Sequence, residues 1–335
     1  MLKIGLIGCG YWGKKLARNF ISSKYTKLEF IADTDKKNKE NYKHIRDLIF
    51  TRNYKKIIDK VDAVAIATPT EAHFRIAYDV IKRNKHLMIT KPPTKYLHEM
   101  IKLKKEAEKR KLVLLIDFTF LYTDSIQHIK KIIKSKKMGK IYSYESMRQN
   151  LGIFNKHENV IMDLACHDIS IILFIFGKMP IAVSATGSSF LPKKQENNAQ
   201  ITLFFKNNFV SYVNCSWLSP IKNRNIIIAG EKSMLLYNDL EKKRKIRLFY
   251  YNKKIRSEKN RHNVHKMLEN YSKTRVYIPK LKGSEALKNE ISDFATCIKK
   301  RKIPISNSHV AVNVTKILNA ANMSIKKKGA LIKIR

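Results

Sequence analysis

The chain is poor in cysteine, in acidic residues and in long apolar runs. Its four cysteines are far apart and form no Cys-x-x-Cys pair; they are Cys9, Cys166, Cys215 and Cys297. This spacing indicates neither a zinc site nor a disulfide framework, so we predict no metal and expect a reducing, cytoplasmic setting. No apolar run approaches the roughly 20 residues that span a bilayer, and Gly8 and Gly10 interrupt the first one. We therefore expect neither a signal peptide nor a membrane partner.

Acidic residues are few beside basic ones: 27 Asp and Glu accompany 68 Lys and Arg, and the formal net charge is +41. Such a field attracts polyanions, so one interpretation is nucleic-acid binding. The other is compositional bias, because Lys, Ile, Asn, Tyr and Phe are abundant while Gly and Ala are few. The two densest basic runs, 242–245 and 299–302, are not interleaved with aromatic residues as in an RNA-binding pattern. We favour bias and predict no specific nucleic-acid partner.

Length and periodicity predict two domains. The 335 residues exceed a typical single domain, and 44% hydrophobic content allows a buried core. Over 1–120, short apolar runs alternate with segments of helical spacing, including a helix near 42–50, which predicts a doubly wound parallel sheet. Over 121–335, strand candidates follow one another directly, which predicts an α+β domain with a largely antiparallel sheet. The predicted fold class is α/β, with a Rossmann domain first.

The clearest motif lies at the start of the chain. A short apolar run ends at Ile7, the next six residues read Gly-Cys-Gly-Tyr-Trp-Gly, and helical spacing follows. In such a strand–turn–helix, Gly8 permits the tight turn, Gly10 lets a pyrophosphate approach and Gly13 allows close helix packing. Asp33 ends the next apolar run, where a carboxylate can accept hydrogen bonds from the adenine ribose. The motif predicts a dinucleotide site, and the alternative is a glycine-rich turn that binds nothing.

Three further groups of residues are candidates for catalysis or cofactor binding. Lys91 follows a predicted parallel strand, where ligands bind in open α/β sheets, although it can equally be an ordinary solvent-facing lysine. Asp163 and His167 are four residues apart, so on a helix the carboxylate would orient the imidazole and raise its basicity, unless they form only a helix pair. Thr68-Pro69-Thr70 and His73 follow another strand. That loop would lie near the nicotinamide side of a dinucleotide, or form only a turn and helix cap.

Together these residues resemble the glucose–fructose oxidoreductase/inositol dehydrogenase/MocA family of nicotinamide-dependent oxidoreductases, over nearly the whole chain. Residues 8–13, with their aromatic pair, look like the family's cofactor fingerprint, and 62–73 look like its fourth-strand motif. Residues 163–168 match its Asp-x-x-x-His-Asp helix. Thr90-Lys91-Pro92 stands where the family has Glu-Lys-Pro, which removes a carboxylate beside the lysine.

The resemblance implies a role for each matched position. Lys91 would sit beside the nicotinamide and the reacting carbon, His167 would exchange the proton of the substrate oxygen, and Asp163 would orient His167. The implied cofactor-binding residues are Gly8, Gly10, Tyr11, Trp12, Gly13, Asp33, Thr68, Pro69, His73 and Lys91. Residues 118–122 and 148–152 are most similar to the branch of the family that acts on nucleotide-linked sugars. They supply the substrate-binding candidates Tyr122, Arg148 and Asn150.

The resemblance thus implies an NAD(P)-dependent oxidoreductase that moves a hydride between nicotinamide and a sugar carbinol or keto carbon. NAD is expected in preference to NADP because Asp33 would repel a 2′-phosphate. A nucleotide-linked sugar of surface polysaccharide synthesis is the first choice of substrate, and a free sugar or cyclitol is the second. The second domain would bind substrate and form a homodimer or homotetramer. The alternatives are a polyanion-binding protein on a Rossmann scaffold and, because of Thr90, a catalytically silent dinucleotide-binding sensor.

We expect any binding of this chain to duplex DNA to be weak, indifferent to sequence and lost as salt rises, because a diffuse positive field acts through counterion release. Fluorescence anisotropy with unrelated duplexes at increasing salt checks this. Tight binding that persists at high salt, or a preference for one sequence, would favour the polyanion-binding class instead.

Overall fold

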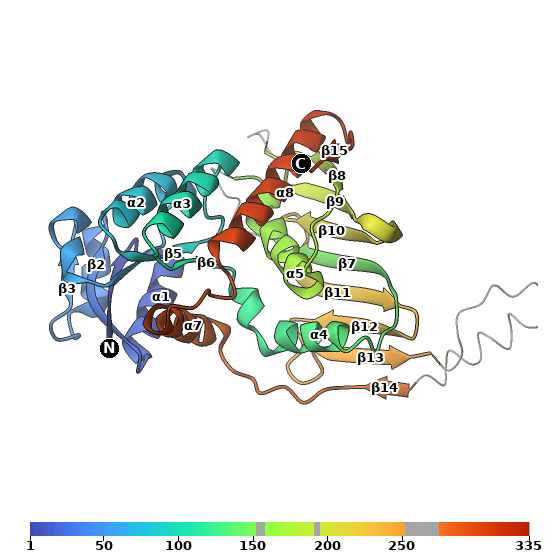
Figure 1. Ribbon diagram of the computed structural model, residues 1–335, viewed down its shortest axis with the longest axis horizontal. Coiled ribbons are helices and arrows are strands. Elements are labelled where there is room, and N and C mark those ends of the chain that lie inside the picture. The colour runs from blue at the N-terminus through green and yellow to red at the C-terminus, as the bar shows by residue number, and fades with distance from the viewer. Residues whose placement is uncertain (152–157, 191–194, 252–274, 335) are drawn as a thin grey trace, which may run out of the picture. The chain divides into compact units, whose positions relative to one another are not determined.

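The computed structural model describes residues 1–151, 158–190, 195–251 and 275–334 (Figure 1). The chain divides into two compact units: Met1–Thr123 with Ser284–Asn319, and Asp124–Gly283 with Ala320–Arg335. The first break lies close to the boundary placed at residue 120 from the sequence. The structure adds the segment 284–319 to the first unit, whereas the sequence prediction placed this segment in the second domain.

The first unit is built on a six-stranded parallel sheet with the order β3-β2-β1-β4-β5-β6. The strands are β1 (Leu2–Ile7), β2 (Thr26–Ala32), β3 (Ile49–Thr51), β4 (Ala63–Ile66), β5 (His86–Thr90) and β6 (Leu114–Asp117). The strand order runs outward in both directions from the adjacent pair β1 and β4, so the sheet is doubly wound, as predicted. The crevice beside such a switch point is where open α/β sheets bind ligands.

Helices cover this sheet as the apolar spacing predicts. They are α1 (Tyr11–Ser22), α2 (Thr70–Lys82), α3 (Leu97–Lys109) and α7 (Ala286–Lys300). Helix α2 packs beside α3, and α1 packs beside α7 (Figure 1). In α1 the buried stripe includes Leu16, Ala17 and Phe20, which recur at the spacing of one helix face.

The segment 284–319 joins the first unit through contacts with its last strand. The Ser306 hydroxyl donates to the carbonyl of Ile116 at 2.5 Å, and the amide of Ile116 donates to the carbonyl of Ser306 at 2.9 Å. The Tyr122 hydroxyl donates to Asp293 at 2.9 Å. These partners are far apart in sequence, so no local pattern could have indicated the pairing.

The helix predicted near 42–50 is wrong. A 3₁₀ segment occupies Lys36–Tyr42, and β3 follows at Ile49–Thr51 as the edge of the sheet, paired in parallel with β2. A strand of three residues is too short to show an alternating pattern, and the spacing of its neighbours imitates a helix.

The second unit contains a nine-stranded sheet with the order β14-β13-β12-β11-β7-β10-β9-β8-β15. Its strands are β7 (Ile141–Gln149), β8 (Ala182–Ser188), β9 (Asn198–Phe204), β10 (Val210–Ser216), β11 (Asn223–Gly230), β12 (Ser233–Asn238), β13 (Ile246–Tyr250), β14 (Arg275–Tyr277) and β15 (Ile332–Lys333). Strands β7 and β10 pair in parallel, and every other neighbouring pair among these described strands is antiparallel. The predicted, largely antiparallel second domain is therefore confirmed.

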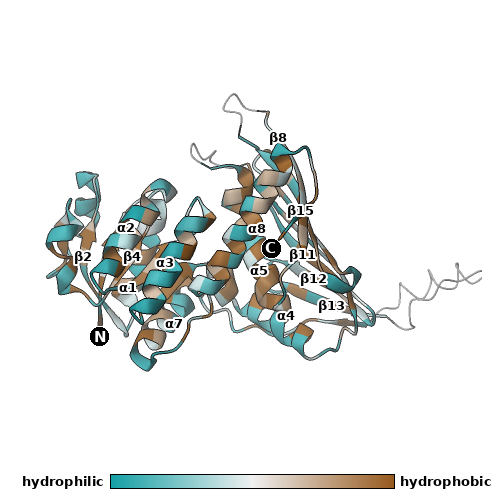
Figure 2. Ribbon diagram, turned by 45° about the horizontal axis from the view of Figure 1, so that its top comes forward, coloured by the Kyte–Doolittle hydropathy of each residue, from teal (hydrophilic) through white to brown (hydrophobic). Residues whose placement is uncertain are grey.

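Helices α4 (Asp124–Lys134) and α5 (Cys166–Phe176) lie on one face of this sheet (Figure 1). Along β7, Tyr144, Ser146 and Arg148 are buried while Glu145 and Met147 are exposed, so alternate side chains face the covered side. Helix α5 is strongly hydrophobic (Figure 2). No helix in the described part of the chain is nevertheless long and apolar enough to cross a membrane. The last long helix is α8 (Ser308–Lys326).

Candidate functional site

The glycine turn that follows β1 has the close packing its sequence predicts. Gly8 has a φ of +90°, and a Cβ placed there would lie 2.6 Å from the carbonyl oxygen of Ala67. A Cβ on Gly13 would lie 2.3 Å from the carbonyl oxygen of Gly8. At Gly10, by contrast, a Cβ would meet no described atom within 4 Å. Gly8 and Gly13 are therefore required by the protein's own packing, while the space at Gly10 is open to a ligand.

Asp33 lies against this turn. It follows β2, and its carboxylate accepts hydrogen bonds from the amides of Cys9, at 2.5 Å, and Asp35, at 2.7 Å. The Cys9 thiol donates to the hydroxyl of Tyr42 at 3.4 Å, and burial raises the pKa of that thiol. The structure thus brings the predicted ribose-binding carboxylate to the edge of the predicted phosphate-binding turn.

The aromatic pair of the turn has two different environments. Tyr11 is 79% exposed, and the ammonium of Lys15 lies 4.2 Å from the centre of its ring. Trp12 is half-buried, and its indole N–H donates to the carboxylate of Asp117 at the end of β6. Tyr11 is therefore accessible to a ligand, whereas Trp12 connects the glycine turn to another strand.

His73 joins the ends of β4 and β5. It is 1% exposed, its Nε2 lies 2.8 Å from the carbonyl oxygen of Thr68, and its Nδ1 lies 3.0 Å from that of Pro92. Burial lowers the pKa of His73, although the backbone carbonyls oppose the change. The imidazole thus lies between the backbone at the end of β4 and the backbone directly after Lys91, which is itself half-buried. Pro69 is exposed and Thr68 half-buried at the same strand end, and their cofactor contacts stay predictions.

Asp163 and His167 lie at a break in the helix geometry. Residues Ile161–Ala165 form a wide π-type turn, a feature common at functional sites, and α5 begins directly after it. Within 161–170, only Asp163 and His167 are not buried. The indole N–H of Trp217 donates to Asp163 at 3.0 Å and fixes the carboxylate. Trp217, far away in sequence and 1% exposed, carries no local signal for this role.

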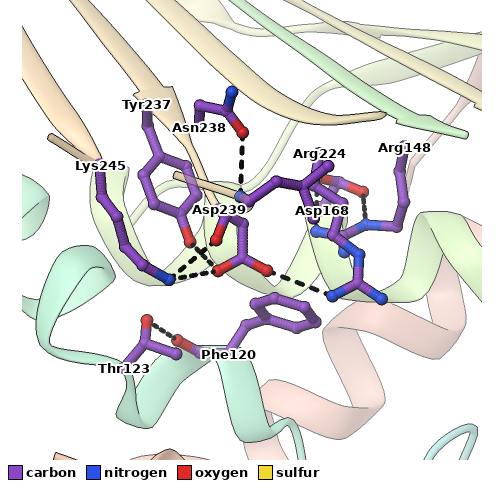
Figure 3. A network of polar contacts seen from close by, with 10 residues as sticks. Phe120, Thr123, Arg148, Asp168, Arg224, Tyr237, Asn238, Asp239 and Lys245 are labelled. Atoms are coloured by element: carbon purple, nitrogen blue, oxygen red, sulfur yellow. Dashed lines mark hydrogen bonds and ion pairs between the residues drawn. The ribbon is translucent and has the colours of Figure 1, made fainter. Parts of the chain in front are cut away.

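Two of the three substrate-binding candidates have side chains that are hydrogen-bonded to other side chains of their own unit. The guanidinium of Arg148, 4% exposed, donates to both carboxylate oxygens of Asp168, at 2.6 and 3.2 Å (Figure 3). Tyr122 is also 4% exposed, and its hydroxyl is bonded within the first unit. Asn150 is half-buried, and its backbone N–H donates to the backbone carbonyl of Ser216 at 3.0 Å. Substrate binding by these three residues stays a prediction.

A second charged cluster in the same unit surrounds Asp239 (Figure 3). Its carboxylate lies 3.2 Å from Arg224 and 3.3 Å from the ammonium of Lys245, and it accepts a hydrogen bond from Tyr237 at 2.9 Å. Burial raises the pKa of Asp239, but the charge of Lys245 and these hydrogen bonds outweigh burial, so the pKa lies below its ordinary value. No motif in the sequence indicates this cluster.

Comparison with known proteins defines the class. Residues 2–118 match the family model described as "Oxidoreductase family, NAD-binding Rossmann fold", and residues 126–236 match "GFO/IDH/MocA C-terminal domain". The chain belongs to the GFO/IDH/MocA family of oxidoreductases, as its motifs suggested.

Curated relatives include sugar and cyclitol dehydrogenases. The UDP-N-acetylglucosamine 3-dehydrogenase of Acidithiobacillus ferrooxidans is 28% identical over 201 residues, which are 58% of this chain and 61% of that protein. The myo-inositol 2-dehydrogenase of Thermotoga maritima is 23% identical over 235 residues, which are 64% of this chain and 68% of that protein. The matched region thus spans about three-fifths of the length of the first relative.

Solved structures establish the same fold over almost the whole chain. The UDP-N-acetylglucosamine 3-dehydrogenase from Acidithiobacillus ferrooxidans superposes with a TM-score of 0.82 at 21% identity, covering 97% of this chain and 98% of that one. An oxidoreductase from Agrobacterium radiobacter, in complex with NAD⁺, L-tartaric acid and magnesium, superposes with a TM-score of 0.82 at 17% identity. It covers 99% of this chain and 98% of that one.

We expect Gly10→Ala to weaken NADH binding about tenfold or more, because the added methyl group enters the space left open for phosphate. Its unfolding free energy should change by about 1 kcal/mol or less, the range for a helix N-cap position. Gly13→Ala is the matched control, and it should lower stability because its Cβ would meet the Gly8 carbonyl. Fluorescence titration and chemical denaturation measure both effects. Wild-type NADH affinity in Gly10→Ala would place the phosphates elsewhere.

Proposed function

We propose that this chain is an NAD-dependent oxidoreductase that moves a hydride between nicotinamide and a carbinol or keto carbon of a sugar. The observation that carries the proposal is the geometry of the glycine turn. Gly8 and Gly13 are packed too tightly for a side chain, Gly10 is open, and the Asp33 carboxylate lies at the edge of the turn.

The residues at this turn fit the dinucleotide that the family description implies. Helix α1 begins at Tyr11, directly after the turn, and the first turn of this fully described helix carries no acidic residue to compete for its positive end. Gly8, Gly10 and Gly13 would hold the pyrophosphate, and Asp33 would hold the adenine ribose. When bound, the nicotinamide supplies the hydride acceptor or donor.

Side chains of this protein would accept the proton of the substrate hydroxyl and stabilise the negative charge on its oxygen. In the oxidation direction, His167 takes the hydroxyl proton, and Asp163, itself fixed by Trp217, orients the imidazole. The ammonium of Lys91 stabilises the negative charge that develops on the oxygen. These assignments rest on the family motif and on the half-buried positions of all three side chains.

A nucleotide-linked sugar is the substrate class that the relatives favour. The UDP-N-acetylglucosamine 3-dehydrogenase supports it both in sequence and in fold. The myo-inositol 2-dehydrogenase supports a cyclitol or free sugar as the second candidate. A panel containing UDP-N-acetylglucosamine, myo-inositol and glucose separates the two classes by NADH formation.

We expect Lys91→Ala and His167→Ala each to lower turnover by a factor of about 10² to 10⁴, the range for a positioned acid–base group. Affinity for NADH should change little, because neither residue belongs to the phosphate or ribose site. Lys105→Ala and His309→Ala are matched controls at exposed positions and should keep wild-type turnover. Stopped-flow and steady-state NADH kinetics measure the effect. Wild-type turnover in Lys91→Ala or His167→Ala would remove that residue from the mechanism.

We expect the wild-type chain to bind NADH more tightly than NADPH, because the Asp33 carboxylate repels a 2′-phosphate. Lys36 and Lys37 lie nearby in sequence and screen part of this repulsion. Asp33→Asn should narrow the preference, while Asp35→Asn, which removes a carboxylate two residues away, should leave it nearly unchanged. Calorimetric dissociation constants for both cofactors measure the ratio. Equal or tighter NADPH binding by the wild type would overturn the assignment of Asp33.

A further inference from the structure

Thr90 stands where the family pattern has a glutamate, so this chain lacks a carboxylate at the position before Lys91. The structure shows that threonine does not replace the missing charge. Thr90 is 8% exposed, and its hydroxyl lies 3.4 Å from Nε2 of His73. A neutral hydroxyl directed at a buried imidazole cannot balance the ammonium of Lys91.

A different carboxylate lies on the neighbouring strand at the same level. In the parallel pair β5–β6, the Cα partner of Thr90 is Asp117, the last residue of β6. Asp117 is 1% exposed. Burial raises the pKa of Asp117, and the positive charge of Lys91 is among the interactions that oppose this rise. The register places Asp117 beside Thr90, the residue before Lys91, and the electrostatic interaction joins Asp117 to Lys91 itself.

We propose that Asp117 is a counter-ion of Lys91 in this chain, a positioning residue that supplies from β6 a negative charge in place of the one missing from position 90. The proposal rests on the proposed function in so far as Lys91 acts on the substrate. It concerns a side chain that the motif comparison did not single out.

The hydrogen bonds around Asp117 fit a carboxylate rather than a carboxylic acid. The indole N–H of Trp12 donates to Oδ2, and the hydroxyl of Thr119 donates to Oδ1. Both oxygens therefore act as acceptors, which is the hydrogen-bonding role of the ionised group. Because Trp12 belongs to the glycine turn, Asp117 also ties Lys91 to the turn that would hold the cofactor.

Glu290 of α7 is the second buried carboxyl group of this cluster, and we expect it to be the one that holds the proton. It is 0% exposed, neither of its carboxyl oxygens has a hydrogen-bond partner among the described residues, and the charge of Asp117 acts on it. Two adjacent buried carboxyl groups do not both ionise near neutral pH. Burial, and then the charge of Asp117, raise the pKa of Glu290 well above its ordinary value. Asp293 on the same helix also raises the pKa of Glu290. Tyr122, whose own pKa is raised by burial, is a further titratable group that interacts with Glu290.

Competitive labelling with acetic anhydride tests the pairing without any substrate. Mass spectrometry of the Lys91 peptide, over a range of pH, gives the apparent pKa of this one amine, and Lys105 in the same digest serves as the internal reference. We expect Asp117→Asn, which keeps the shape and removes the charge, to lower the apparent pKa of Lys91 by about 1 or more. Glu290→Gln is the matched control. It exchanges one neutral group for another and should leave the Lys91 titration nearly unchanged.

A rescue variant completes the design. Thr90→Glu in the Asp117→Asn background should return the apparent pKa of Lys91 toward the wild-type value, because it restores a carboxylate at the family position. Melting temperatures verify folding, and Asp117→Ser replaces Asp117→Asn if the latter does not fold. An unchanged Lys91 titration in a folded Asp117 variant would overturn the proposal. Wild-type turnover in Lys91→Ala, together with a shifted Lys91 titration in Asp117→Asn, would instead refute the proposed function and leave the ion pair standing.

Discussion

The approach of Gly13 to the carbonyl of Gly8 is the constraint on which the first unit depends. A side chain at position 13 would fall 2.3 Å from that oxygen, so the start of α1 is pressed against the end of β1. The amide of Cys9, in the middle of the turn, is thereby presented to Asp33, and the indole of Trp12 is presented to Asp117. The close approach of Gly13 to Gly8 thus brings the turn to two acidic side chains, Asp33 directly after β2 and Asp117 at the end of β6.

Buried charge organises the second unit in a different way. Arg148 on β7 and Asp168 on α5 form an ion pair with both side chains at most 5% exposed. Such a pair adds little net stability, but loss of one partner leaves an uncompensated buried charge at a cost of about 3–5 kcal/mol. The pair therefore specifies one position of α5 on the sheet. Since His167 immediately precedes Asp168, the same contact sets the position of the candidate acid–base residue.

Most of the architecture could be predicted from periodicity, because its elements are long enough to show a period. Strands β1, β4 and β5, the helices between them and the glycine turn all follow from local pattern. The edge strand β3 was missed because three residues show no alternation. The place of Ser306 beside Ile116 could not be predicted, because the pairing joins distant segments.

The residues of the candidate site also fall into two groups, those that belong to sequence motifs and those whose contacts join distant segments. Gly8, Gly13, Asp33, Lys91 and His167 stand in motifs, so they can be predicted as site residues from the sequence alone. Trp217 and Asp117 lie outside any motif, and only the folded structure shows their hydrogen-bond partners and the burial of Glu290. The sequence also placed Arg148 among substrate-binding residues without revealing that Asp168 engages its guanidinium.

Because acidic residues are scarce in this chain, the position of each one is more informative than the position of a lysine. With 68 basic side chains in 335 residues, the identity of a lysine carries little information about its position. An aspartate is rarer here, and several of those that remain occupy buried or half-buried positions with specific partners: Asp33, Asp117, Asp163, Asp168 and Asp239. In a chain this rich in lysine, an acidic residue with a specific buried partner is a stronger indication of a structural requirement than a lysine is. In a strongly basic protein, the buried acidic residues are therefore a useful guide to candidate functional positions.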